Sequence, residues 1–203
     1  MYLPKTPIIA KKIFPKLTWD NKNKEQAVYL SFDDGPTPSI THWVLDLLNQ
    51  YQAKATFFCL GKNVVLYPEI FERIIKEGHS IGNHTYNHLN AWNTPKEKYL
   101  NDIKSCERVF HSKLFRPPYG KLKPGLRTKI LKDYKIIMWD IMTYDFDQSL
   151  SPNQCIENVC KHVQAGSIIV MHDSLKAEKN LKGSLPSILQ YFTDQNIKML
   201  GLQ

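Results

Sequence analysis

One stretch near the start of the chain, Val28–Pro36, constrains the fold more than any other. Its apolar residues alternate with their neighbours, and this alternation predicts a β-strand. Gly35 and Pro36 end the strand, because proline has no N–H to donate to a neighbouring strand. Asp33 and Asp34 fall at that end, where successive strand residues point to opposite faces. The two carboxylates can therefore reach one site only if the backbone turns there, as the Gly-Pro pair allows.

Length and composition limit the class of protein. A chain of 203 residues with 42% hydrophobic content can bury a sizeable core in one domain. Its 27 Lys and Arg residues exceed its 19 Asp and Glu residues, so the net charge is +8. The basic residues are scattered, so we expect a solvated surface and no nucleic-acid partner. The four cysteines form no Cys-x-x-Cys pair, which argues against a zinc ribbon or a disulfide scaffold.

The sequence contains no candidate membrane span or secretion signal. No apolar run approaches the roughly 18 residues that a membrane helix needs. The apolar run 8–10 is interrupted at once by Lys11 and Lys12, so it is too short for the core of a signal peptide. We therefore expect a cytoplasmic monomer, with an extracytoplasmic location if the sequence has been trimmed.

The pattern of apolar residues predicts an arm followed by one catalytic domain. Residues 1–26 contain three prolines among lysines, and we expect them to form an irregular arm packed on domain 27–203. Within that domain, segments with strand character alternate with segments of helical spacing. Strands are expected at 27–32, 55–60, 80–83, 114–116, 135–139, 167–171 and 197–202. Helices are expected after Ser39 and at 68–78, 95–110, 126–131, 152–166 and 185–192.

This alternation predicts an α/β fold in which crossover helices connect parallel strands. About seven strands in a chain of this length indicate a distorted (β/α)7 barrel rather than a full eightfold barrel. A doubly wound open sheet is the alternative. It is disfavoured because no glycine-rich loop follows the first strand.

Polar side chains gather where the predicted strands end. In a parallel barrel, the carboxyl ends of the strands meet on one face, and chemistry occurs there. The candidates, in chain order, are Asp33 and Asp34 after the first strand, His84 and His88 after the third, Arg116 at the end of the fourth, Asp145 beyond the fifth and His172 at the end of the sixth, where Asp173 also falls. We expect these residues to form one site.

The spacing of His84 and His88 is suited to metal binding. On a helical turn, residues four apart lie on one face, so both imidazoles could point the same way. Two histidines and one carboxylate hold a divalent metal and leave positions for water. The adjacent carboxylates at the first strand end supply the third ligand, although the pattern alone does not say which one.

Arg116 and His172 are candidates for positioning and for proton transfer. Arg116 opens the rigid run Arg116–Gly120, and its guanidinium can hold a carboxylate through two hydrogen bonds. His172 follows a strongly apolar strand, and a histidine at the end of such a buried strand can act as a general acid. Asp145 would then orient that histidine and raise its basicity.

These motifs, taken in order, resemble those of the polysaccharide deacetylases with the NodB homology domain, carbohydrate esterase family 4. The resemblance covers about residues 27–202. The matching segments are Ser31–Gly35, His84–His88, Arg116–Tyr119, Met142–Phe146 and Val170–His172.

The resemblance implies a role for each matched residue. Asp33 is implied to be the catalytic base and Arg116 to position it. Asp34, with the two histidines, is implied to bind the metal, with zinc first and cobalt, nickel or manganese as alternatives. The backbone N–H of Tyr119 is implied to stabilise the oxyanion, and His172, paired with Asp145, to be the general acid.

The fourth motif departs from the family pattern, which is Asp-x-x-Asp-Trp. The first Asp is replaced by Met142 and the Trp by Phe146, while Asp145 keeps the second position. The partner of the general acid is therefore retained, but the wall of the substrate groove is altered. Substrate identity is the property that this change affects.

The resemblance implies metal-assisted hydrolysis of N-acetyl groups on a chitin-like or peptidoglycan-like glycan, with release of acetate. An acetyl-ester hydrolase acting on acetylxylan, or a hydrolase of non-sugar amides, is the alternative on the same fold. A non-catalytic carbohydrate-binding module would need neither Asp33 nor His172. A nucleic-acid binder would show a steep salt dependence and no metal.

Overall fold

The computed structural model describes residues 3–21 and 26–203. Its strands are β1 (Ala27–Asp33), β2 (Thr56–Cys59), β3 (Ser80–Asn83), β4 (Leu114–Phe115), β5 (Lys135–Ile136), β6 (Ile141–Met142), β7 (Ile168–His172) and β8 (Lys198–Leu200). Its helices are α1 (Ile8–Ile13), α2 (Ile40–Gln50), α3 (Gly61–Leu66), α4 (Pro68–Lys76), α5 (Lys96–Glu107), α6 (Pro124–Ile130), α7 (Pro152–Cys160) and α8 (Glu178–Asp194), with a 3-10 turn η1 (Pro118–Gly120).

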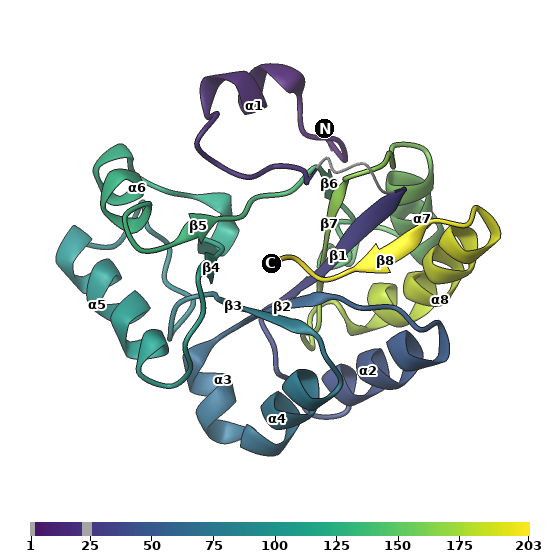
Figure 1. Cartoon of the computed structure of the whole chain (residues 1–203), viewed down its shortest axis with the longest axis horizontal. Helices are drawn as coiled ribbons and strands as arrows, with labels where there is room; N and C mark the ends of the chain where they lie inside the picture. Colours follow the sequence, from purple (N-terminus) through teal and green to yellow (C-terminus); the bar gives the residue numbers. More distant parts are fainter. Residues whose placement is uncertain (1–2, 22–25) are drawn as a thin grey trace.

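The strands form one curled parallel sheet with helices outside it (Figure 1). Its order is β5-β4-β3-β2-β1-β7-β6, and β8 pairs with the start of β1 beside β2. From β1 to β5 each strand adds on the same side, whereas a doubly wound sheet reverses direction near its middle. The predicted α/β fold and distorted (β/α)7 barrel are therefore confirmed, and the doubly wound alternative is wrong.

The strand predicted at 135–139 is the main difference within the sheet. Strand β5 pairs with β4, and β6, a few residues later, pairs with β7. One segment of the chain therefore supplies the strands at both edges of the open barrel. Ile137 donates its N–H to Phe115 at 2.8 Å, and Asp140 donates its N–H to Ile168 at 2.9 Å. The predicted strand is thus shortened to β5, and β6, which was not predicted, follows it, because the barrel does not close by strand pairing at this point.

Several predicted helix boundaries also differ. Helix α3 was not predicted, since six residues provide too little apolar periodicity to detect. Helix α7 ends at Cys160 rather than at Gly166, and α8 begins at Glu178 rather than at Leu185. The buried positions near the start of α8 include the polar residues Asn180 and Ser184, so the apolar stripe is interrupted there.

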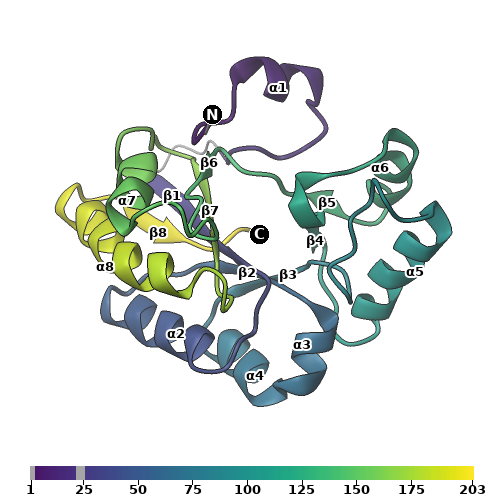
Figure 2. The same ribbon diagram turned by 180° about the vertical axis from the view of Figure 1, so that it is seen from behind.

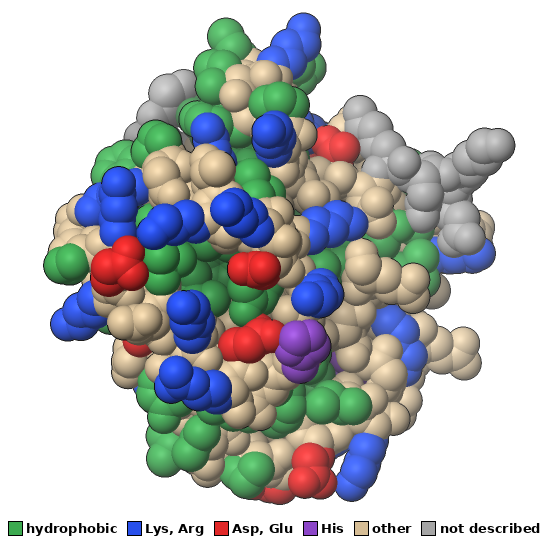
Figure 3. Space-filling model, turned by 60° about the vertical axis from the view of Figure 1, so that its left-hand side comes forward, with side chains coloured by type: hydrophobic (Ala, Val, Ile, Leu, Met, Phe, Trp, Pro, Cys, Tyr) green, Lys and Arg blue, Asp and Glu red, His purple; other side chains and the backbone are tan. Residues whose placement is uncertain are grey.

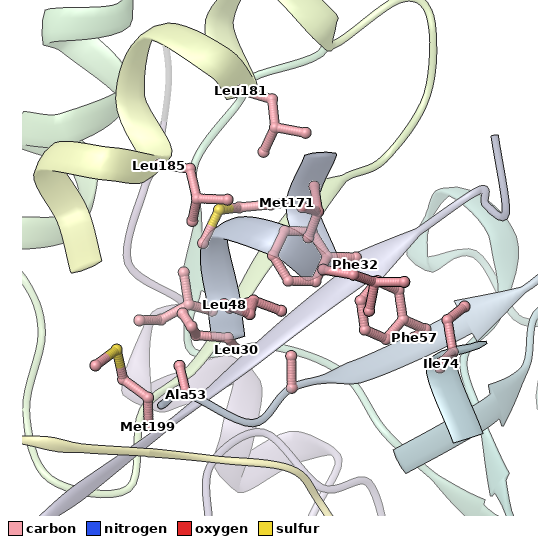
Figure 4. Packing of buried hydrophobic residues seen from close by; sticks show 14 of the residues in the cluster. Leu30, Phe32, Leu48, Ala53, Phe57, Ile74, Met171, Leu181, Leu185 and Met199 are labelled. Atoms are coloured by element: carbon pink, nitrogen blue, oxygen red, sulfur yellow. The ribbon is translucent and has the colours of Figure 1, made fainter. Parts of the chain in front are cut away.

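Alternation along the strands separates an outer from an inner face. Leu30 and Phe32 of β1 point outward into the main core, where they meet α2 and α8, and Figure 4 shows this packing around Leu48, Met171 and Leu185. Tyr29 belongs to a second cluster on the inner face of the sheet. Because side chains alternate, Ser31 and Asp33 share that inner face with Tyr29. The register of β1 therefore directs the catalytic-base candidate into the barrel.

The arm lies across the open side of the barrel, between β5 and β6 (Figures 1 and 2). Thr18 forms a parallel bridge with Ile137, and Lys5 forms an antiparallel bridge with Ile141. The arm was expected to be irregular, but residues 8–13 form α1. Residues 1–2 and 22–25 of the predicted arm lie outside the described residues.

A buried ion pair anchors the arm. Asp140 is fully buried, and its carboxylate contacts Lys11 at 2.6 Å and Lys5 at 3.0 Å. The hydroxyl of Ser167 donates to the same carboxylate at 2.6 Å. Burial by itself would raise the pKa of Asp140, but Lys11, Ser167 and Lys5 together lower it. The arm therefore supplies two cations to a carboxylate that would otherwise be buried without charge compensation.

Charged side chains cover the outside of the molecule in mixed order. Figure 3 shows Lys and Arg spread over one face, with acidic and apolar side chains between them. Across residues 3–21 and 26–203, no helix combines the length and the apolar character needed to span a membrane. All four cysteines, Cys59, Cys106, Cys155 and Cys160, are free thiols.

Candidate active site

A pocket of about 500 Å³ lies at the carboxyl ends of the strands. It is lined by Asp33, Asp34, His84, His88, Pro117, Tyr119, Gly120, Trp139, Met142, Tyr144, Phe146, His172 and Lys176. Six of the eight residues predicted for the site are in this lining. The other two, Arg116 and Asp145, are fully buried behind it and contact Asp33 and His172. The structure therefore brings all eight together.

Arg116 holds Asp33 in place from inside the barrel. Its guanidinium donates to the Asp33 carboxylate at 2.7 Å and to the Ser31 hydroxyl at 2.8 Å. It also donates to the carbonyls of Ile137 and Met138, at 3.3 and 2.9 Å. Burial lowers the pKa of Arg116, and the charge of Asp33 opposes this shift. The ion pair therefore fixes one oxygen of Asp33 and leaves the other facing the pocket lining.

The turn after β1 begins one residue earlier than the Gly-Pro signal suggests. Asp34 itself has a φ of 80°, which redirects its side chain relative to Asp33. Gly35 donates its N–H to Asp173 at 3.1 Å, and a Cβ at Gly35 would lie only 2.0 Å from that carboxylate. Asp173 also accepts a hydrogen bond from the Thr41 hydroxyl at 2.5 Å. Glycine is therefore required where this turn contacts a buried carboxyl group.

His84 and His88 are brought together by a loop and not by the helical turn that their spacing suggested. Thr85 and His88 have positive φ values of 67° and 60°. Asp102 of α5 accepts hydrogen bonds from the N–H groups of Tyr86 and Asn87, at 3.0 and 2.9 Å. A carboxylate on a neighbouring helix thus fixes the loop, and the sequence spacing carried no sign of it.

The tautomer of His84 prepares it as a metal ligand. Its Nδ1–H donates to the carbonyl of Arg116 at 2.7 Å, which leaves Nε2 free. Burial lowers the pKa of His84 to about 4, so the imidazole is neutral, as metal binding requires. A backbone carbonyl therefore sets both the orientation and the protonation site of the ring.

The residues Asp34, His84 and His88 fit a divalent metal. One ligand atom from each lies within 4.8 Å of the others. The Oδ1 atom of Asp34 lies 3.6 Å from Nε2 of His84 and 3.1 Å from Nε2 of His88. That oxygen is buried and accepts no hydrogen bond from the described residues. Burial opposes ionisation of Asp34, but the neighbouring histidines keep its pKa low. An anionic oxygen and two imidazole nitrogens are typical zinc donors.

His172 is paired with Asp145, as predicted. Its Nδ1 lies 2.8 Å from one carboxylate oxygen, and its backbone N–H donates to the other at 2.7 Å. Thr143 donates its hydroxyl to the same carboxylate at 3.0 Å. Burial favours the neutral ring, but the charge and hydrogen bond of Asp145 raise the pKa of His172 to about 9. His172 is therefore a protonated acid at neutral pH.

Aromatic side chains form the walls of the pocket. The Tyr119 ring is 59% exposed, and its centroid lies 4.6 Å from that of His88. Phe146 meets the His172 ring edge-on at 5.0 Å. Met142 and Phe146, which depart from the family's fourth motif, both line the pocket. The departure therefore changes the surface that a substrate meets and leaves the His172–Asp145 pair intact.

Strained backbone is concentrated around this pocket. Asp34, Thr85, His88, Tyr119 and Tyr144 all have positive φ values, although none is glycine. Such conformations cost free energy and persist where function or surrounding structure requires them. Their grouping agrees with a site that holds its groups in fixed positions before substrate binds.

Three residues that support the site were given no role from the sequence. Asp102 carried no signal, and Ser31 carried only the signal of opening a matched motif, because both roles depend on partners far away in the chain. Asp173 had a weak one, since it follows His172 directly at the end of an apolar strand. In the structure it shapes the turn at Gly35 and its carboxyl is fully buried. Burial raises the pKa of Asp173 to about 8, against the hydrogen bond from Thr41.

The fold and the site together define a hydrolase built on an open parallel barrel. A family model described as polysaccharide deacetylase matches residues 20–137, which is more than half of the chain. The chain belongs to the polysaccharide deacetylase family. The expected family and the expected enzyme class, a carbohydrate deacetylase, are therefore confirmed.

Similar proteins of known name agree with this assignment. A peptidoglycan-N-acetylglucosamine deacetylase of Bacillus cereus is 35% identical over 194 residues, covering 91% of this chain and 90% of the relative. The peptidoglycan-N-acetylmuramic acid deacetylase PdaC of Bacillus subtilis is 32% identical over 182 residues. This match covers 87% of this chain but only 38% of the length of PdaC. A crystal structure of a peptidoglycan N-acetylglucosamine deacetylase with a bound N-hydroxybenzamide superimposes with a TM-score of 0.88 and 29% identity, covering 97% and 95% of the two chains.

Proposed function

We propose that this protein removes N-acetyl groups from the amino sugars of a peptidoglycan-type glycan and releases acetate. The observation that carries the proposal is that one pocket contains the Asp34–His84–His88 cluster, the Asp33 carboxylate and the His172 ring. The named relatives over most of this chain act on peptidoglycan, which supports that glycan over chitin. Chitin oligomers remain the comparison substrate in the test below.

We assign the metal to Asp34, His84 and His88, with zinc as the proposed ion. The neutral imidazole of His84 and the unpaired Asp34 oxygen support this assignment. When bound, the metal supplies Lewis acidity, which polarises the acetyl carbonyl and lowers the pKa of water. Cobalt, nickel and manganese are alternatives, because affinity for such a donor set depends on metal availability as well as on geometry.

Asp33 acts as the general base in this proposal. It takes a proton from the attacking water, whose oxygen forms the new bond to the acetyl carbon. Arg116 and Ser31 hold its position, since the guanidinium contacts both. The backbone N–H of Tyr119 donates to the carbonyl oxygen as negative charge develops on it.

His172 acts as the general acid that breaks the carbon–nitrogen bond. It donates a proton to the departing nitrogen, which leaves as an amine while the acetyl group becomes acetate. Asp145 keeps His172 protonated and orients its ring. An amine leaves poorly without a proton, so this donation matters more for an amide than for an ester.

A panel of acetylated substrates tests the proposal. The purified protein, loaded with zinc, is incubated with peptidoglycan fragments, N-acetylglucosamine oligomers and acetylxylan. Released acetate is quantified, and the sugar product is examined by mass spectrometry for a free amine. We expect acetate and free amine from peptidoglycan fragments at the highest kcat/KM. Release from acetylxylan alone would favour the ester-hydrolase alternative.

A further inference from the structure

A cation with no acidic partner lies in the wall of the pocket. Lys176 lines the pocket and belongs to the short connection between β7 and α8. That connection is held at both ends, by the buried Asp173 and by the buried Ala177, whose N–H donates to Ser174 at 3.0 Å. The backbone that carries Lys176 is therefore fixed relative to the neighbouring His172.

The ammonium group of Lys176 rests on the aromatic wall. Its Nζ lies 5.5 Å from the ring centroid of Phe146, and that ring also contacts His172. A weak cation–π contact of this kind positions the ammonium and leaves its N–H groups free to donate. In residues 3–21 and 26–203, Lys176 forms no ion pair, whereas Lys182 in the next turn is paired with Glu178 at 2.7 Å.

The other charges in and behind the pocket already have partners. Asp33 is paired with Arg116 and His172 with Asp145, while Asp34 faces the two imidazoles as a proposed metal ligand. Among the described residues that line the pocket, Lys176 is the cation without a counter-charge. A lysine in this position favours an anionic group on the substrate, and a carboxylate is a well-matched acceptor for its three N–H donors.

We propose that Lys176 binds a carboxylate of the glycan next to the acetamido sugar, and so selects glycans with acidic sugars over neutral ones. This inference rests on the proposed function. In a peptidoglycan-type glycan this carboxylate is the lactyl group of a muramyl sugar that carries no stem peptide, because an attached peptide turns that group into a neutral amide. Neutral chitin-like chains lack such a group and gain nothing from Lys176.

The test compares two substrates that differ only in charge. One is an N-acetylglucosaminyl-N-acetylmuramyl oligosaccharide with a free lactyl carboxylate, and the other is the same oligosaccharide with that group converted to a primary amide. The measured quantity is the ratio of kcat/KM for the free form to that for the amide. We expect Lys176→Met to lower this ratio about three- to fivefold, as expected for a solvent-accessible ion pair. Lys176→Glu should lower it further, because like charges repel.

Lys179→Met is the matched control. Lys179 is an exposed lysine in the first turn of α8 and does not line the pocket, so the ratio should stay at the wild-type value. The wild-type ratio should also fall as salt is raised from low to physiological concentration and beyond, because mobile ions screen exposed charges. A ratio unchanged in Lys176→Met, or lowered equally in Lys179→Met, would overturn the proposal.

Binding measurements separate this inference from the proposed function. Calorimetry of the Asp33→Asn variant with both oligosaccharides reports recognition, and acetate release by the wild type reports turnover. Tighter binding of the carboxylate form with no acetate release would contradict the deacetylase proposal and still support the role of Lys176. Acetate release with equal binding of the two forms would support the deacetylase proposal and overturn the role of Lys176.

Discussion

The carbonyl oxygen of Arg116 accepts the Nδ1–H of His84 at 2.7 Å, while the guanidinium of the same residue contacts Asp33 at 2.7 Å. One residue thus links a proposed metal ligand, His84, to the proposed general base, Asp33. The two contacts are chemically independent, since one uses the main chain and the other the side chain. Substitution of Arg116 therefore removes only the second.

Arg116→Met should destabilise the protein and lower activity without abolishing metal binding. Removing the guanidinium leaves Asp33 buried and unpaired, and breaking such a pair costs about 3–5 kcal/mol of unfolding free energy. The carbonyl that orients His84 remains. Chemical denaturation, together with zinc titration of the folded variant, measures the two effects.

The double variant Arg116→Met/Asp33→Asn is the control for the charge effect. It removes both partners, so it should recover part of the lost unfolding free energy. Equal stability of the single and double variants would show that the loss came from packing rather than from an unpaired carboxylate.

The two adjacent carboxylates should respond differently to the same substitution. Asp33→Asn keeps size and hydrogen bonding but cannot accept a proton, so turnover should fall by about 10²–10⁴-fold with metal content near wild type. Asp34→Asn removes the anionic ligand, so metal affinity should fall first, with activity partly restored at high zinc concentration. Metal titration and steady-state rates on both variants decide the roles. The opposite pattern, with metal lost in Asp33→Asn and kept in Asp34→Asn, would reverse them.

Asp145→Asn should move the alkaline limit of activity toward lower pH. The pKa of His172 is raised to about 9 by Asp145 against the effect of burial, so the acid is protonated through neutral pH. Without the carboxylate, burial dominates, the pKa of His172 falls, and the acid loses its proton earlier as pH rises. The pH profile of kcat/KM on an amide substrate should shift by at least about one pH unit. An unchanged alkaline limb would mean that another group sets it.

Asp140→Asn should destabilise the protein at neutral pH but much less in acid. The folded-state pKa of Asp140 is lowered below its ordinary value of 3.8, so its contribution is present above that value and is lost as pH falls through the folded pKa. Breaking the buried pair with Lys11 should cost about 3 kcal/mol of unfolding free energy at pH 7. Urea denaturation at pH 7 and below pH 4 measures the difference between wild type and variant.

Glu72→Gln provides the comparison for an exposed ion pair. Glu72 contacts Lys76 at 3.4 Å, and both side chains are more than half exposed. Its loss should change the unfolding free energy by less than about 1 kcal/mol at any pH. A similar cost for both substitutions would contradict the anchoring role of Asp140.

Much of the fold and site was predictable from the sequence, because those features depend on local order. The alternation in β1 predicted its strand, and the end of that strand located Asp33 and Asp34. The motif segments then placed His84, Arg116 and His172 at neighbouring strand ends. In a parallel barrel such ends meet on one face whatever the detailed packing, so these residues could be placed in one site, while their roles came from the family resemblance.

The tertiary structure decided the features that depend on partners distant in sequence. The chain crosses from one sheet edge to the other between β5 and β6, and the arm covers that gap through Lys5 and Lys11. Asp102 shapes the histidine loop, where the spacing had suggested a helical turn. Lys176 lies over Phe146 only because two loops meet in space. Periodicity and motif spacing describe the chain along its length, whereas buried ion pairs and loop contacts arise between segments whose proximity the packing of the whole barrel creates.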